Sequence, residues 1–252
     1  MKGYESFAAA FDAFGDDEIY ARIAGFTDDL IADHLKYLKK GTTRPEITVY
    51  DIACGTGKLC RALREMCYDV SGSDISEDCL TIAASKSEDI FYTRQDMTEL
   101  LLPAPVDVVT CTLDSLNHLD SLESIKKTFK RVNACLKEGG LFLFDTNTPY
   151  KHEYVLADNV FVYENEDIYL VWANDFTGDR DSSVDMTIDI FIREGDVYRR
   201  EYEEIREIAF EPEIISSALR SCGFEIISLT DGYTDEPVTS VTERTVFSAR
   251  KI

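Results

Sequence analysis

Short apolar runs alternate with helical patterns through the middle of the chain, and this order restricts the fold more than any other feature. Each run is followed by residues that place apolar side chains every three or four positions, which is the spacing of a helix face. The runs that have the character of strands are 47–53, 69–74, 91–96, 106–112 and 141–146. Strand, helix and strand repeated in this way predict an α/β fold with a mostly parallel sheet covered by helices on both faces.

Helical patterns also occur before and between these strands. Apolar positions recur at helical spacing over 19–38 and end near Gly41, which predicts N-terminal helices ahead of the sheet. A second pattern, over 122–136, is followed by Gly139 and Gly140. Because glycine commonly ends helices, we expect this helix to stop at the two glycines.

The period of the apolar pattern changes after residue 150. Positions 184–193 alternate strictly between apolar and polar residues, as in an antiparallel strand with one face in water. Neighbouring runs at 159–164, 168–174 and 197–206 have the character of partner strands. The sequence therefore predicts a small antiparallel sheet inserted into the main fold.

The parallel-sheet pattern resumes after this insertion. A helix is opened by Pro212 and closed by Gly223, and two further strands follow at 225–229 and 242–250. With them, the main sheet is expected to be doubly wound and to have seven strands. The predicted division of the chain is N-terminal helices over 1–44, a domain with the main sheet over 45–150 and 210–252, and the inserted sheet over 151–209.

Charge excludes several classes of partner. The chain carries 26 Lys plus Arg and 48 Asp plus Glu, a formal net charge of −22. Since nucleic acids and anionic membranes are bound through Lys and Arg, we expect neither as a partner. Residues 151–213 hold 18 acidic and 6 basic residues, a net charge of −12. This field favours a cationic partner such as an amine, although a solvated acidic surface that maintains solubility is the simpler explanation.

Cysteine usage and the first residues indicate the compartment. The seven cysteines include no CxxC pair and have no histidine nearby at metal-binding spacing, so we expect reduced thiols and no metal site. Asp12 and the acids after it interrupt any apolar run near the start, so no signal peptide is expected. No stretch reaches the roughly 18 to 20 apolar residues that span a bilayer. The sequence favours a cytoplasmic protein.

The segment 49–59, VYDIACGTGKL, combines an apolar strand, a turn of small residues and the start of a helix. Gly55 and Gly57 allow a ligand to approach the backbone closely at the edge where open α/β sheets bind cofactors. Asp74 ends the next strand, at a spacing from these glycines that places a carboxylate against ribose hydroxyls. A ligand that contains a nucleoside is therefore expected.

Two nucleoside cofactors fit this segment unequally. A dinucleotide fingerprint has a third glycine where this chain has Cys60, which argues against a seat for a pyrophosphate. Asp51 adds a carboxylate that would repel a pyrophosphate and that suits the ammonium group of S-adenosylmethionine. A nicotinamide-dependent oxidoreductase, and a protein that binds S-adenosylmethionine without turnover, stay open as alternatives at this point.

Several segments together resemble the class I S-adenosylmethionine-dependent methyltransferases, a family with a Rossmann-like fold. The resemblance covers about residues 45–148 and 211–251, and Ala53 stands where the family has its first turn glycine. It is carried by DIACGTG at 51–57, GSDIS at 72–76, RQDM at 94–97, DVVTCTLDSLNHL at 107–119 and LKEGGLFLFDTNT at 136–148. The resemblance implies a methyltransferase that uses S-adenosyl-L-methionine as its cofactor.

Position by position, the resemblance implies which residues surround the methionyl part of the cofactor. Asp51 and the turn backbone, with Ala53, Gly55 and Gly57, would enclose it. Leu113, just after the fourth strand, would lie near its carboxylate or sulfonium.

The same resemblance implies the contacts to the nucleoside. Asp74 would accept hydrogen bonds from the ribose, and Ile75 would pack on the adenine. Asp96 would bind the exocyclic amine, and the backbone of Met97 would bind the ring. The alternative for Asp96 is a helix N-cap ahead of 98–102.

The loop 113–118 after the fourth strand is expected to face the methyl group. His118 is our candidate for a general base or a hydrogen-bond partner of the substrate, and Asn117 for a substrate contact. Methyltransferases that act on the exocyclic amines of bases resemble one another in an Asn/Asp-Pro-Pro-aromatic motif at this place. This chain lacks the motif, which again argues against a nucleic acid substrate.

The inserted sheet is similar in position to that of sugar N,N-dimethyltransferases and glycine N-methyltransferase-like enzymes. In those relatives the sheet and the N-terminal helices enclose the acceptor pocket, which implies a small-molecule acceptor here, an amine by preference. The sugar enzymes carry a tyrosine at the place where this chain has Phe14 or Gly15. Because this chain lacks that tyrosine, an aminosugar is disfavoured as its substrate. The sequence leaves open whether the protein forms a homodimer. Aromatic residues expected in the lid that the N-terminal helices form, with Tyr20 as a substrate contact, are Tyr4, Phe7, Phe11, Phe14 and Tyr20.

Overall fold

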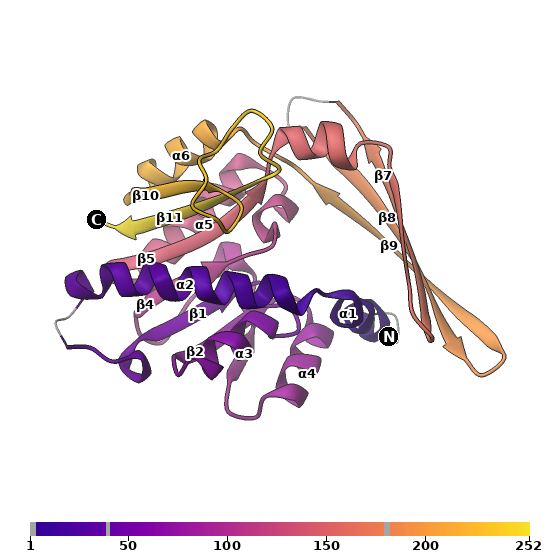
Figure 1. The fold of residues 1–252 in the computed structure, drawn as a ribbon, viewed down its shortest axis with the longest axis horizontal. Helices are drawn as coiled ribbons and strands as arrows, with labels where there is room; N and C mark the ends of the chain where they lie inside the picture. The colour runs from indigo at the N-terminus through magenta and orange to yellow at the C-terminus, as the bar shows by residue number, and fades with distance from the viewer. Residues whose placement is uncertain (1–3, 39–40, 179–181) are drawn as a thin grey trace.

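The computed structural model describes residues 4–38, 41–178 and 182–252, and the side chains of Tyr4 and Phe11 lie outside what it describes. A seven-stranded sheet flanked by helices forms the body, and a separate four-stranded antiparallel sheet projects from it (Figure 1). The predicted fold class, with its seven strands, N-terminal helices and inserted sheet, is confirmed.

The large sheet has the strand order β10-β11-β5-β4-β1-β2-β3. Its strands pair in parallel except that β11 runs antiparallel to both of its neighbours. The carboxyl ends of the parallel strands therefore meet at one edge, where the loops that follow them lie close together. The strands are β1 (Thr48–Ile52), β2 (Asp69–Asp74), β3 (Phe91–Arg94), β4 (Val106–Cys111), β5 (Leu136–Asn147), β10 (Phe224–Asp231) and β11 (Arg244–Lys251).

Helices cover both faces of this sheet. On β5, Phe142 and Phe144 face the cluster that contains α5 and α6, whereas Leu141 and Leu143 face the cluster that contains α2 and α3. This alternation follows from the two-residue period of a strand, and it explains why β5 is apolar at consecutive positions. The helices are α1 (Tyr4–Phe14), α2 (Asp17–Leu38), α3 (Lys58–Glu65), α4 (Glu77–Lys86), α5 (Leu122–Cys135) and α6 (Pro212–Ser221).

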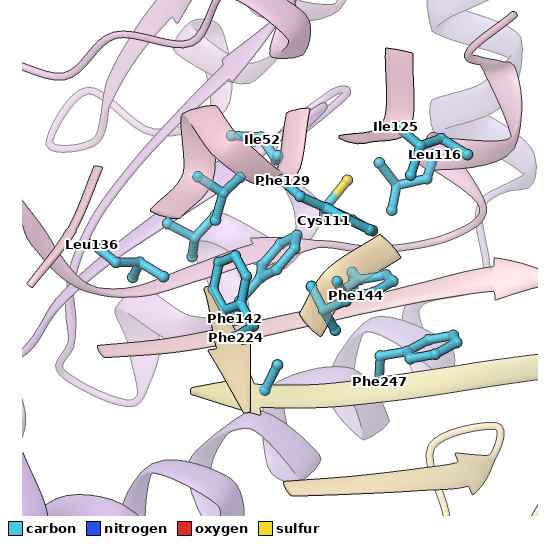
Figure 2. Close-up of a cluster of buried hydrophobic side chains, with 14 of the residues drawn as sticks. Ile52, Cys111, Leu116, Ile125, Phe129, Leu136, Phe142, Phe144, Phe224 and Phe247 are labelled. Atoms are coloured by element: carbon cyan, nitrogen blue, oxygen red, sulfur yellow. The ribbon is translucent and has the colours of Figure 1, made fainter. Parts of the chain in front are cut away.

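Aromatic side chains dominate the core on the α5 and α6 face (Figure 2). The ring of Phe144 is stacked against those of Phe247, at a centroid distance of 4.7 Å, and Phe142, at 4.6 Å. The ring of Phe129 from α5 lies 5.2 Å from that of Phe144. All of these side chains are fully buried, so they join helix and sheet into one closely packed layer.

The predicted end of the helix before β5 is wrong. The helix ends at Cys135, and the extended residue Leu136 already begins β5. Gly139 adopts a φ of +74°, and a Cβ on Gly140 would lie 2.8 Å from the carbonyl oxygen of Lys137. The two glycines therefore allow an irregular start of the strand and a close backbone approach, and they do not end the helix.

The inserted sheet has the order β6-β7-β8-β9. Its inner face packs on α1, where Ile188 and Ile190 contact Ala10 within one buried cluster. Its outer face leaves apolar side chains in solvent, such as Val162, which is 51% exposed. The chain reaches the sheet through a π-helix, η4 (Lys151–Leu156). The strands are β6 (Val160–Glu164), β7 (Ile168–Phe176), β8 (Val184–Glu194) and β9 (Val197–Glu207).

Among the helices in the described ranges, none is both long and apolar enough to cross a bilayer.

Candidate active site

The turn after β1 is built from residues in the left-handed backbone region. Ala53, Gly55 and Gly57 have φ values of +54°, +54° and +76°. A Cβ on Gly57 would lie 2.5 Å from the hydroxyl oxygen of Tyr92, so only glycine fits there. Ala53 adopts its conformation at a cost of about 1 kcal/mol, which explains why the related family has glycine at this place. The turn stays narrow and leaves its backbone open to a ligand.

Asp74 connects this turn to the end of β2. Its Oδ2 accepts a hydrogen bond of 2.8 Å from the Gly55 N–H, and its Oδ1 accepts one of 2.8 Å from the Ser76 N–H. An ionised carboxylate can accept about four hydrogen bonds, so each oxygen retains capacity for a ligand hydroxyl. The side chain is therefore held in a fixed position at the edge of the site.

A pocket of about 390 Å³ opens at the carboxyl edge of the large sheet. Loops after β1, β2, β3 and β4 contribute to it, together with the start of α5. It brings together Ala53, Asp74, Ile75, Asp96, Met97 and His118 from the predicted set. The other predicted residues, which lie outside its lining, are Tyr20, Asp51, Gly55, Gly57, Leu113 and Asn117.

Two pocket residues have surfaces suited to a flat ring. Ile75 is 63% exposed although it is apolar, and Met97 lies across the same pocket. Asp96 caps the short helix η2 (Met97–Glu99), because its Oδ1 accepts a 2.8 Å hydrogen bond from the Thr98 N–H. This is the capping geometry that the sequence allowed as an alternative, and it holds the carboxylate at the rim of the pocket.

Asp51 is buried behind the turn. Its Oδ1 accepts a 2.6 Å hydrogen bond from the Thr110 hydroxyl, and the Cys60 thiol lies 3.5 Å from Oδ2. Burial raises the pKa of Asp51 to about 7, and the hydrogen bonds from Thr110 and Cys60 oppose this shift. The side chain can therefore change its charge near neutral pH.

The loop after β4 begins with two strained residues. Leu113 and Asp114 both have a φ of +57°, which is uncommon for residues other than glycine. Their N–H groups donate hydrogen bonds of 2.6 Å and 2.7 Å to the two carboxylate oxygens of Asp145. Tyr233 and Arg244 also bind Asp145, so strands β5 and β11 hold this loop in place.

Charges around Asp114 keep it ionised. Burial opposes ionisation, but Arg244, Lys151 and His118 outweigh it and hold the pKa of Asp114 well below its ordinary value. The side chain of Asn147 donates a 2.8 Å hydrogen bond to Asp114 Oδ2. Asp114 therefore places a negative charge within the loop after β4.

Asn117 is buried, and its amide binds three backbone groups. Its Nδ2 donates to the carbonyl oxygens of Ile208, at 2.8 Å, and Asn147, at 3.2 Å. Its Oδ1 accepts a 2.9 Å hydrogen bond from the Asn147 N–H. In addition, the backbone carbonyl oxygen of Asn117 accepts a 2.9 Å hydrogen bond from the Ile208 N–H. Asn117 thus joins the loop to β5 and to the end of the inserted sheet.

His118, at the end of η3 (Ser115–His118), reaches into the pocket and toward the inserted sheet. Its Nε2 lies 3.6 Å from Oε1 of Glu207, at the end of β9. Glu207 is 4% exposed, and its Oε2 lies 3.3 Å from Nε2 of His152. The side chain of Asn147 also donates a 3.1 Å hydrogen bond to Oε2. The sequence analysis did not identify Glu207, because no local pattern shows that the end of a distant strand returns to this loop.

Tyr20 lies on α2 near the turn. Burial, followed by the charges of Asp51 and Asp114, raises the pKa of Tyr20 to about 12, so its hydroxyl keeps its proton at neutral pH. The ammonium nitrogen of Lys58 lies 5.6 Å from the centroid of its ring. The same ammonium donates a 2.8 Å hydrogen bond to the carbonyl oxygen of Gly15, which ties the α1–α2 connection to the start of α3.

Sequence comparison finds relatives over nearly the whole chain. A family described as a methyltransferase domain matches residues 49–140. A protein of Geobacillus sp. strain WCH70, named "Putative methyltransferase", is 32% identical over 253 residues, which cover 98% of this chain and 99% of that protein.

Comparison with solved structures also finds methyltransferases. An S-adenosylmethionine-dependent methyltransferase of Clostridium acetobutylicum is similar with a TM-score of 0.81 and 31% identity, over 98% of each chain. An amino pentose methyltransferase of Micromonospora echinaspora, solved with S-adenosylmethionine bound, has a TM-score of 0.73 and 19% identity, over 98% of this chain and 97% of that one. At that identity the second likeness concerns the fold alone.

Proposed function

The chain belongs to the S-adenosylmethionine-dependent methyltransferases, and we propose that its acceptor is a small-molecule amine. The observation that carries this proposal is the charge of the pocket. Among the charged described residues that line it, Asp74 and Asp96 are our candidates for the cofactor, and Asp120 and the imidazole of His118 remain for the acceptor, without a lysine or arginine. Such a lining attracts cations and disfavours carboxylate or phosphate groups.

The residues of the pocket suit the cofactor. Asp74, fixed by two backbone N–H groups, has the remaining lone pairs to bind the ribose hydroxyls. Ile75 and Met97 offer apolar surface for the adenine, and Asp96 offers a carboxylate for its amine. The narrow turn at Gly55 and Gly57 suits close approach of the methionyl part, beside Asp51. When bound, the cofactor supplies a methyl group on a sulfonium; an acceptor attacks this methyl group in line, and S-adenosylhomocysteine leaves.

The protein contributes mainly position and proton transfer to this reaction. Methyl transfer from a sulfonium needs an acceptor nitrogen held in line with the methyl group. An aliphatic amine is protonated at neutral pH, so its nitrogen has to lose a proton before it can attack the methyl group. His118, at the pocket and 45% exposed at its side chain, is our candidate to accept it.

We also propose that the two chain segments outside the cofactor-binding domain enclose the acceptor. The α1–α2 connection is tied to α3 by Lys58, which binds Gly15 and Asp17. Helix α1 packs between this body and the inner face of the inserted sheet, through Ala10 (Figure 1). The fold neighbours include an amino pentose methyltransferase, which supports an amine as the acceptor that these segments enclose.

A panel of acceptors tests the proposal. Small primary and secondary amines, matched carboxylic acids, phenols and RNA oligonucleotides are each supplied with S-adenosylmethionine at physiological salt. The production of S-adenosylhomocysteine is measured. We expect turnover with amines to exceed turnover with each other class by at least about tenfold, which corresponds to about 1.4 kcal/mol of transition-state stabilisation.

The matched control is His118→Asn. This variant is expected to bind S-adenosylmethionine with wild-type affinity in calorimetry and to lose amine turnover, since the base has been removed and the ribose contacts have not. Preferential methylation of RNA or of carboxylic acids by the wild-type protein would contradict the proposal.

A further inference from the structure

Glu207 is a buried carboxylate that lies against the imidazole of His118, and no motif of the cofactor-binding domain includes it. It comes from the end of β9, more than fifty residues beyond the main body's fifth strand. It is 4% exposed, so it is not positioned to bind an acceptor itself. We propose that Glu207 is a positioning residue that sets the tautomer and basicity of His118; this inference rests on the proposed function.

The two residues are held beside each other by the backbone. Asn117 and Ile208, their immediate neighbours in the chain, exchange two hydrogen bonds, from the Ile208 N–H to the Asn117 carbonyl oxygen at 2.9 Å and from Asn117 Nδ2 to the Ile208 carbonyl oxygen at 2.8 Å. His118 Nε2 lies 3.6 Å from Glu207 Oε1, a distance that makes an ion pair when His118 is protonated.

The second oxygen of Glu207 faces other groups. Asn147 Nδ2 donates to Oε2 at 3.1 Å. His152 is fully buried, and its Nδ1 donates to the Ser182 carbonyl oxygen at 2.6 Å, since a carbonyl oxygen can only accept. Its Nε2 therefore carries the lone pair and donates no hydrogen bond to Oε2, 3.3 Å away. The hydrogen bond from Asn147 holds Oε2, and Oε1 lies toward His118.

This arrangement determines which nitrogen of His118 can act as a base. A carboxylate beside Nε2 favours the tautomer with its proton on Nε2, so that Nδ1 carries the lone pair. The acceptor amine transfers its proton to Nδ1 before its nitrogen attacks the methyl group, and the imidazolium that forms is stabilised by Glu207. The proton is released to solvent from Nδ1 through the exposed side of the ring, and Glu207 keeps its charge throughout.

Other charged groups face His118 and act on it together with Glu207. Asp114 lies on its own loop, and Asp74, Asp96 and Asp120 line the same pocket. Lys151 and His152 from η4 lie behind Glu207, and Arg244 and Asp145 from β11 and β5 lie behind Asp114. The test therefore changes Glu207 alone and leaves these groups in place.

The experiment follows His118 directly. The chain has three histidines, so the C–H signals of the imidazoles can be followed by NMR against pH and assigned with His118→Asn. We expect Glu207→Gln to move the midpoint of the His118 titration to lower pH, because the charge that stabilises the imidazolium is lost. An unchanged midpoint would overturn the proposal.

Kinetics give the second readout. With an amine acceptor, the limb of the pH–rate profile where activity rises with pH should move to lower pH in Glu207→Gln. In the same variant kcat should fall at least about tenfold, while KM changes less than about twofold. A loss of activity with no movement of the limb would indicate a structural role and overturn the proposal.

Two further variants keep the result interpretable. Glu204→Gln removes the same charge from the same strand on its exposed outer face and is expected to change neither readout. Glu207→Asp keeps the charge and withdraws it by one methylene, so it should lie between wild type and Glu207→Gln even if the glutamine variant folds poorly. If amines are not methylated but the His118 midpoint moves, the proposed function fails and the coupling of the two residues stands.

Discussion

The seven-stranded sheet is covered on both faces, whereas the four-stranded sheet is covered on one. On β4 and β5, Val109 and Phe144 are 0% exposed. On the outer face of the inserted sheet, Val162 is 51% and Tyr202 is 52% exposed. The large sheet therefore tolerates little change in side-chain volume, and the inserted sheet tolerates much more on its outer face.

This difference corresponds to two tasks. The turns and loops that we propose hold the cofactor follow strands packed between two layers of helices, so Asp74 and the β1 turn have little freedom. The inserted sheet contacts the body through α1, η4 and the end of β9, where Glu207 lies beside His118. On our proposal, the outer face of this sheet can change without disturbing the cofactor pocket.

The largest expected effect is on stability in the large sheet. Phe144→Ala removes a ring stacked between Phe142 and Phe247 and leaves a cavity, so the free energy of unfolding should fall by about 3–5 kcal/mol. The matched change in the inserted sheet, Ile190→Ala, should cost about 2–3 kcal/mol and leave cofactor affinity unchanged. Urea unfolding measures both. Equal losses of stability in the two variants would contradict tighter packing in the large sheet than in the inserted sheet.

The next effect, about 4 kcal/mol, should depend on pH. Since burial raises the pKa of Asp51 from 3.8 to about 7, the folded protein binds a proton that the unfolded chain has released. This contribution to stability is fully present below about pH 4 and is lost as the pH rises through 7. Asp51→Asn, which mimics the neutral form, should therefore be more stable than wild type by about 4 kcal/mol at pH 8 and equal to it near pH 4.

Urea unfolding at several pH values measures this difference. Asp175→Asn on the exposed outer face of β7 is the control from the other sheet, and its effect should stay within about 0.5 kcal/mol at every pH. A constant difference between wild type and Asp51→Asn across the pH range would show that Asp51 is ionised throughout.

Next in size is the loss of cofactor affinity in Asp74→Ala. Removing a charged acceptor of two ribose hydroxyls, which also orders the Gly55 N–H, should weaken S-adenosylmethionine binding about 100-fold, or about 2.7 kcal/mol. Calorimetric titration gives the affinity. Asp69→Ala, at the opposite end of β2, should change it less than about twofold. Unchanged affinity in Asp74→Ala would remove the ribose assignment.

The smallest effect is expected on the outer face of the inserted sheet. Val162→Ala should change the free energy of unfolding by no more than about 0.5 kcal/mol, because the side chain is half exposed already. Urea unfolding and sedimentation measure stability and association together. A loss above about 1.5 kcal/mol would mean that this face is covered in solution and would make the two sheets more alike.

Much of the fold was predictable because each strand and helix has its own local period. The strict alternation over 184–193 predicted β8, and the continuous apolar run before Asp145 predicted the doubly covered β5. The end of α5 was not predictable from Gly139 and Gly140, because their role depends on the backbone of Lys137 and Asp107, which the fold brings close.

The sequence alone determined the class of fold and the family, because these depend on contiguous segments with fixed geometry, and the cofactor contacts of the turn after β1 stay a prediction. The neighbours of His118 were decided by tertiary structure. Glu207 lies 89 positions further along the chain, and it meets His118 only because β9 returns to the loop after β4, where Asn117 binds Ile208. Contacts between distant segments follow from packing and hydrogen bonding across the whole fold, and no local period encodes them.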